Sequence, residues 1–100
     1  MALETIPFDA AEFFDDVQSQ AELVADAFES GDAPYIAHAL GIVARARGMT
    51  QVAKDAGVTR EALYRALSQE GDPKLSTLLG VLKALGISLH AEKRPDSEAA

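Results

Sequence analysis

Seven polar side chains between residues 51 and 68 have the types and spacing that could do chemistry in this sequence. Arginine, carboxylate, hydroxyl and amide groups of this kind contact base edges and phosphates in DNA-binding proteins. From residue 60 onward they recur at intervals of three and four, which places them on one side of a helix. The candidate DNA-binding residues are Gln51, Thr59, Arg60, Glu61, Tyr64, Arg65 and Ser68.

Each type of side chain in this set suggests a different contact. Arg60 and Arg65 can pair with guanine through two parallel hydrogen bonds or clamp a phosphate. Glu61 can accept a hydrogen bond from the amino group of cytosine. Thr59 and Gln51 stand at predicted helix starts, where backbone amides and polar side chains hold phosphates. The alternative for each charged group is an ordinary solvated surface.

Tyr64 has two equally good interpretations, namely a contact to a phosphate or a thymine methyl group, or partial burial with its hydroxyl at the surface. Lys54 and Lys74 are weaker phosphate candidates. Arg45 and Arg47 stand in the last turn of a predicted helix, and interaction with the helix dipole explains them better than DNA does.

A frame of small and apolar residues positions these side chains. Ala53 allows two short helices to cross closely, Gly57 allows a sharp turn between them, and Val58 fills the junction. Leu63 and Ala66 fall on the inner side of the second helix. The frame combines a small residue, a glycine, an apolar residue at the junction and a polar cap. This combination indicates two crossing helices more specifically than any one of its features alone.

The frame predicts a helix-turn-helix over 51–67. Its first helix, 51–56, is expected to be capped by Thr50, and its reading helix, 60–68, by Thr59. The alternative is a helical hairpin with no function beyond packing in a small bundle.

Apolar periodicity also predicts helices over 18–30, 33–47 and 75–85, and the alternation over 87–91 is compatible with a short strand. The expected fold is therefore all-α. We expect an acidic N-terminal arm and helix over 1–31, a DNA-binding domain over 32–92 and a flexible tail over 93–100.

Charge is distributed unevenly along the chain. The net charge is −7, but residues 1–33 hold nine acidic side chains and no basic one, whereas all nine lysines and arginines lie between residues 45 and 94. An acidic arm and a basic domain call for different partners. The acidic total therefore does not argue against DNA binding by the second part.

Several classes of function are disfavoured by the composition. The chain has no cysteine and only two histidines, so no metal site or cofactor is predicted. It contains neither a secretory signal nor an apolar run of about 20 residues, which makes the cytoplasm the expected location. No nucleophile–base pair or phosphate loop is present, and an enzyme is the least favoured class.

Residues 37–91 resemble the addiction-module antidote family, the HigA-like antitoxins with a lambda-repressor-type (Xre/Cro) helix-turn-helix. The matching segments are ALGIVARARGMTQVAKDAGVTREALYRALS and GDPKLSTLLGVLKALGISLHA, and the upstream segment FDAAEFFDDVQSQAELVADAFESGDA also resembles this family. The sequence departs from the broader pattern at two places: Gln51 lies only two residues before Ala53, and Lys74 stands where a serine or threonine cap is common.

The resemblance implies a five-helix, lambda-repressor-like domain that forms a homodimer. It also implies that the protein neutralises a RelE/ParE-like toxin encoded beside it and binds operator DNA to repress its own operon. The alternatives are a stand-alone Xre-type repressor without a toxin partner and an interaction module that does not bind DNA.

Two surfaces keep open interpretations. Residues 1–30 are a candidate toxin contact because acidic groups suit a basic RNA-acting toxin, but their aromatic and aliphatic side chains could equally close the core. The leucine-rich segment 75–89 is a candidate dimer interface, although at least Leu78, Leu82 and Leu85 are expected to be buried in the core of the monomer.

Overall fold

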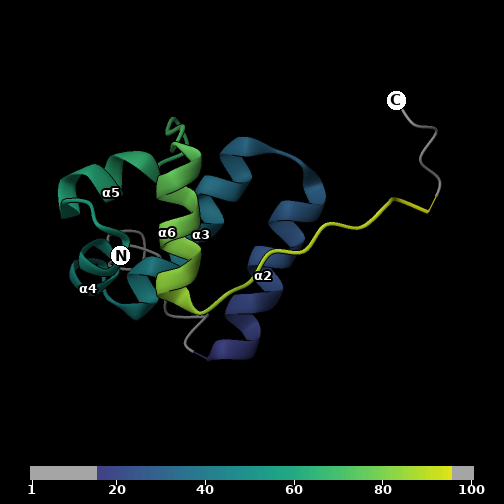
Figure 1. Ribbon diagram of the computed structural model, residues 1–100, viewed down its shortest axis with the longest axis horizontal. Coiled ribbons are helices and arrows are strands. Elements are labelled where there is room, and N and C mark those ends of the chain that lie inside the picture. Colours follow the sequence, from purple (N-terminus) through teal and green to yellow (C-terminus); the bar gives the residue numbers. More distant parts are fainter. Residues whose placement is uncertain (1–15, 96–100) are drawn as a thin grey trace, which may run out of the picture.

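The computed structural model describes residues 16–95, and within that range it is entirely helical (Figure 1). The aromatic residues Phe8, Phe13 and Phe14 of the predicted arm lie outside the described residues. The helices are α2 (Val17–Ser30), α3 (Ala33–Arg47), α4 (Met49–Ala56), α5 (Arg60–Ala66) and α6 (Leu75–Leu85). The prediction of an all-α fold is confirmed, and no helix in 16–95 is long and apolar enough to cross a membrane.

Helix α2 is fixed at both ends and along its side. The Asp16 carboxylate accepts a hydrogen bond of 2.7 Å from the Ser19 amide at its start, and Gly31 ends it with φ 71°. Tyr35 on α3 donates a 2.6 Å hydrogen bond to the Asp26 carboxylate. This bond, with smaller contributions from desolvation and the Asp26 charge, raises the pKa of Tyr35 above its ordinary value.

The core is built around α3, in which every residue from 39 to 44 is buried. Apolar side chains from all five described helices meet there, including Val24 of α2, Leu63 of α5 and Leu82 of α6. Helices α4 and α6 approach closely because Gly80 has no side chain: a Cβ at this position would lie 3.1 Å from the Ala56 carbonyl oxygen. The core therefore holds α4 and α6 on α3, and α5 packs against α4.

Three sequence predictions about these elements are corrected. Helix α4 begins at Met49 after Gly48, so Thr50 is not its cap, and α5 ends at Ala66 instead of residue 68. The strand considered for 87–91 is absent. This segment is extended (Figure 1), but the described residues contain no strand. A β-strand forms only when it pairs with a neighbouring strand, and 87–91 has no such neighbour in 16–95.

Candidate nucleic-acid interface

The turn between α4 and α5 sets the direction of α5. Ala53 is buried on the inner side of α4, and Gly57 adopts φ 79°, a left-handed conformation that favours glycine. The Val58 amide then donates to the Ala53 carbonyl oxygen over 3.0 Å, and the Val58 side chain packs on the core. The predicted frame of Ala53, Gly57 and Val58 is thus confirmed.

Helix α5 is seated by Leu63, which is fully buried, and by Leu67, which follows its last turn. Its other side faces solvent and carries Arg60, Glu61, Tyr64 and Arg65, all of them exposed. Four of the seven candidate residues therefore share one open face of a helix that is anchored from behind.

Thr59 begins α5 as its N-cap. Its hydroxyl oxygen accepts a hydrogen bond of 3.0 Å from the Ala62 amide, which would otherwise lack a partner in the first turn of the helix. The cap predicted for this position is confirmed. The Thr59 hydroxyl oxygen accepts this bond, and its O–H group can still donate to a phosphate.

Replacing Thr59 with alanine is expected to lower the free energy of unfolding by about 0.5–2 kcal/mol, because the Ala62 amide loses its partner. Urea denaturation followed by circular dichroism measures this change. Thr59→Ser retains the oxygen and serves as the control, with stability close to that of the unmodified chain. Equal stability of the alanine and serine variants would contradict the capping role.

Arg60 is held across the α4–α5 surface by two neighbours. Its guanidinium lies 5.6 Å from the centroid of the Tyr64 ring, donates to the Tyr64 hydroxyl over 3.5 Å and reaches the Thr50 hydroxyl over 3.4 Å. The Tyr64 contact is the main cause that raises the pKa of Arg60, so this side chain stays charged. Tyr64 itself is 44% exposed and its hydroxyl accepts the Arg60 bond at the surface, which is compatible with both of its interpretations.

Gln51 and Ser68 lie less directly on this face. The Gln51 amide donates to the Asp55 carboxylate, one turn further along α4, over 2.9 Å. Ser68 is half-buried beyond the end of α5, and its hydroxyl donates to the Arg65 carbonyl oxygen over 2.9 Å. The second N–H and the side-chain oxygen of Gln51 can still contact a ligand, whereas the Ser68 hydroxyl bonds a carbonyl oxygen of the last turn of α5.

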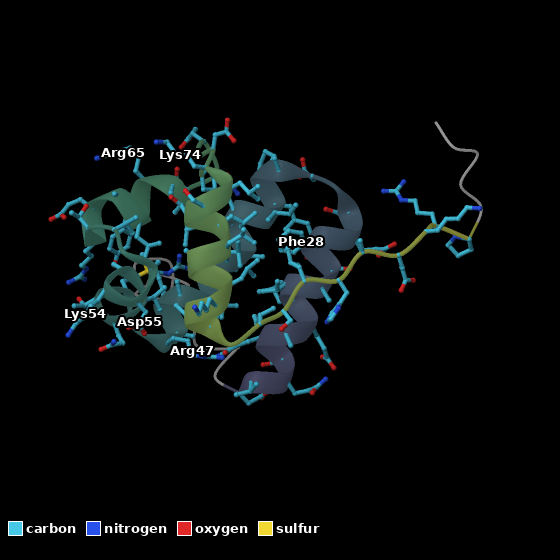
Figure 2. All side chains as sticks on the ribbon, in the orientation of Figure 1. Phe28, Arg47, Lys54, Asp55, Arg65 and Lys74 are labelled. Carbon is cyan, nitrogen blue, oxygen red and sulfur yellow. The ribbon has the colours of Figure 1, made fainter. Side chains whose placement is uncertain are left out.

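The structure adds Thr50 and brings Lys74 close to the candidate face. Thr50 is exposed in the first turn of α4 and contacts Arg60. The sequence did not predict this contact, because Thr50 stands where a helix cap is expected. Arg65 and Lys74 line one shallow pocket between α5 and the start of α6, together with Glu70 and Asp72 (Figure 2). Two cations from separate elements thus flank the end of α5.

Arg47 has a structural role that dipole arguments did not predict. Its guanidinium donates to the Gln20 side-chain oxygen over 2.6 Å and to the Leu85 carbonyl oxygen over 3.1 Å. Gln20 is buried, so this polar contact satisfies a group that water cannot reach. Arg47 therefore ties the ends of α3 and α6 to α2.

Residues 16–95 contain no group of three or more histidine, cysteine, aspartate or glutamate side chains that could hold a metal ion. The candidate site consists instead of a solvent-facing set of hydrogen-bond donors and acceptors on α4 and α5. Such a set can bind a polar surface.

Comparison with known proteins identifies the family to which this arrangement belongs. A family model described as a probable addiction module antidote protein matches residues 4–93. The chain belongs to the addiction module antidote family. An uncharacterised protein from Haemophilus influenzae (strain ATCC 51907 / DSM 11121 / KW20 / Rd) is 37% identical over 86 residues, covering 86% of this chain and 89% of that protein. No solved structure matches.

The antidote family match includes both α2 and the α4–α5 pair. An antidote protects against a toxin, so a toxin partner follows from the family in general terms. The match does not distinguish the HigA-like, Xre-type branch that the sequence resembles, and it does not name a toxin class.

Proposed function

We propose that this protein is the antitoxin of a type II toxin–antitoxin module, which neutralises a RelE/ParE-like toxin by direct binding and represses its own operon by binding operator DNA. In this proposal the α4–α5 pair is a helix-turn-helix of the Xre type. The protein acts by binding in the cytoplasm and not by catalysis, and it uses no cofactor. The division into an arm over 1–31, a DNA-binding domain over 32–92 and a tail over 93–100 belongs to the same proposal.

The observation that carries the DNA-binding part is the exposed polar face of α5 on a buried apolar back. Leu63 is 0% exposed, whereas Arg60 and Arg65 of the same helix are exposed. A helix presented in this way can enter the major groove, where arginine pairs with guanine. Gln51, Thr59, Glu61, Tyr64 and Ser68 complete the proposed interface, and the cation of Lys74 lies beside it.

The charge of the described residues is consistent with two different partners. Residues 16–32 hold five acidic side chains and no basic one, whereas residues 45–83 hold seven basic and four acidic side chains. Helix α2 packs against α3 and lies on the opposite side of the molecule from α5 (Figure 1). A basic toxin on α2 would therefore not obstruct DNA on α5.

The proposal includes a homodimer, because one short helix reads too few base pairs and a two-fold dimer reads two half-sites about 34 Å apart. Leu75 and Leu79 on α6 are 68% and 50% exposed and supply apolar area for such an interface. Leu82 and Leu85 are buried in the core, and Leu78 packs against it.

Two measurements test this function on the full chain. Fluorescence anisotropy with the DNA upstream of its own gene should give specific binding that weakens steeply between about 50 and 200 mM salt. Equal affinity for a scrambled duplex would refute operator recognition. Co-expression with the product of the adjacent gene should yield a complex.

A stand-alone Xre-type repressor is the alternative. Specific operator binding without capture of the neighbouring product would favour that alternative. Capture of the neighbouring product without specific DNA binding would support the antidote function and refute autorepression.

A further inference from the structure

An open groove runs between α2 and the extended segment 87–95 on the side of the molecule away from the α4–α5 surface (Figure 1). Its volume is about 730 Å³, and Val17, Ala21, Ala25 and Phe28 of α2 line one wall. We call these four residues the α2 strip. Ile87 and Leu89 stand across from it, so both walls carry apolar side chains among polar lining residues such as Ser88.

The α2 strip leaves apolar surface in contact with solvent. Val17 is 69% exposed and Leu89 is 45% exposed, whereas Val24, which points inward beside the strip, is only 2% exposed. The strip residues recur at intervals of four, four and three, which is the spacing of one face of a helix. Ala21 and Ala25 are small, so a second helix could approach α2 closely along this strip.

Acidic groups border the strip on its outer side. Glu22 and Glu29 are exposed and lie seven residues apart, so both stand on the same edge of α2. On the opposite wall, Glu92, Arg94 and His90 line the groove. Arg47, which also lines it, is already bonded to Gln20 and Leu85. The α2 side therefore offers an apolar strip with a negative border, because residues 16–32 hold no basic side chain, while the cations Arg47 and Arg94 line other parts of the groove.

We propose that the α2 strip and its edge of Glu22 and Glu29 form the docking site for a basic, amphipathic helix of the partner toxin. This inference rests on the proposed function and adds to it a surface and the chemistry of the partner segment. Apolar side chains of that helix enter the groove, and its lysines or arginines face Glu22 and Glu29. A second copy of this chain is disfavoured as the occupant because it would bring another acidic α2 against the first.

The test uses the full chain and the product of the adjacent gene, with binding measured by isothermal titration calorimetry. Ala25→Arg places bulk and positive charge on the strip, and Glu29→Lys reverses the edge. Each is expected to weaken toxin binding at least about tenfold, as loss of a desolvated contact or charge pair does. Helix content, melting temperature and operator binding should stay unchanged, because both positions are exposed and far from α5.

Glu70→Lys is the matched control. It makes the same charge change at an exposed residue of the turn between α5 and α6, which does not line the groove, and it should leave toxin affinity unchanged. Equal affinity of all three variants and the unmodified chain would overturn the proposed site while leaving the antidote function intact. A change of oligomeric state in Ala25→Arg, measured by light scattering, would instead assign the groove to a second copy and also overturn it.

A synthetic peptide tests the docking site if the adjacent gene product does not bind. The probe is a helical peptide with leucine along one seam and lysine at the flanking positions, and its counterpart carries glutamate in place of lysine. The lysine peptide should bind the unmodified chain and Glu70→Lys, and it should bind Ala25→Arg at least about tenfold more weakly. Absence of binding, or equal binding of the glutamate peptide, would refute the docking site. Binding without any natural partner would support the site and count against the proposed function.

Discussion

Replacing Leu63 with alanine is expected to lower the free energy of unfolding by about 2–5 kcal/mol, the usual range for a leucine deleted from a packed core. Leu63 is 0% exposed and lies in the cluster that joins α3, α4, α5 and α6. A domain of this size has a total stability of roughly 5–15 kcal/mol, so one side chain accounts for a large part of it.

This loss should also lower the population of molecules that carry the proposed reading surface. Helix α5 has only seven residues, and an isolated helix of that length does not form in water. Operator affinity is therefore expected to fall in step with the folded fraction. Urea denaturation with circular dichroism measures the first effect, and anisotropy at matched protein concentration measures the second.

Glu61→Ala is the control for stability, because Glu61 lies two residues away on the exposed side of α5. A surface substitution of this kind changes the free energy of unfolding by about 0.5 kcal/mol or less. If Leu63→Ala lowered the free energy of unfolding no more than Glu61→Ala does, Leu63 would not anchor α5 in the core.

Replacing Arg60 or Arg65 with alanine is expected to weaken operator binding by about 1–3 kcal/mol, which is a factor of roughly 5 to 150, and to leave folding intact. Both side chains lie on the open face of α5. Anisotropy titrations over a range of salt concentrations measure the affinity, and thermal melts confirm that the variants are folded.

The salt dependence separates the two kinds of contact. If an arginine binds a phosphate, its loss should weaken all sequences equally and reduce the slope of affinity against salt by about one unit. If it pairs with a guanine, its loss should relax discrimination at one base pair. Arg60 is the stronger candidate for a positioned contact because Tyr64 and Thr50 already restrict its guanidinium.

Lys83→Ala is the matched control for charge, since Lys83 is an exposed cation on α6 outside the α4–α5 pair. It should reduce operator affinity much less than either arginine variant. An Arg60 or Arg65 variant that binds operator as the unmodified chain does would remove that side chain from the proposed interface.

The polar junction at Arg47 joins α2 to the ends of α3 and α6. Gln20 belongs to α2, Arg47 ends α3, and Leu85 ends α6, so one guanidinium holds the α2 side to the helices that support α4. The groove beside α2 is partly lined by Arg47 as well. A partner on α2 would thus bind against a surface that the rest of the fold keeps in place.

Features of the fold that depend on neighbouring residues could be predicted from the sequence. Four glycines with positive φ end four of the helices, and the Ala53–Gly57–Val58 turn was predictable because its requirements are local. The acidic character of residues 1–33 and the basic character of the segment that follows were also evident from order alone.

Features of the fold that depend on residues distant in the sequence could be recognised only from the three-dimensional arrangement. Thr50 looked like a cap, but α4 begins at Met49, which is buried in the core, and the Thr50 hydroxyl meets Arg60 instead. Alternation over 87–91 suggested a strand, yet no partner strand exists in 16–95 and the segment became a groove wall. Arg47 reaches residues 27 and 38 positions away, and no local pattern encodes a contact over such separations.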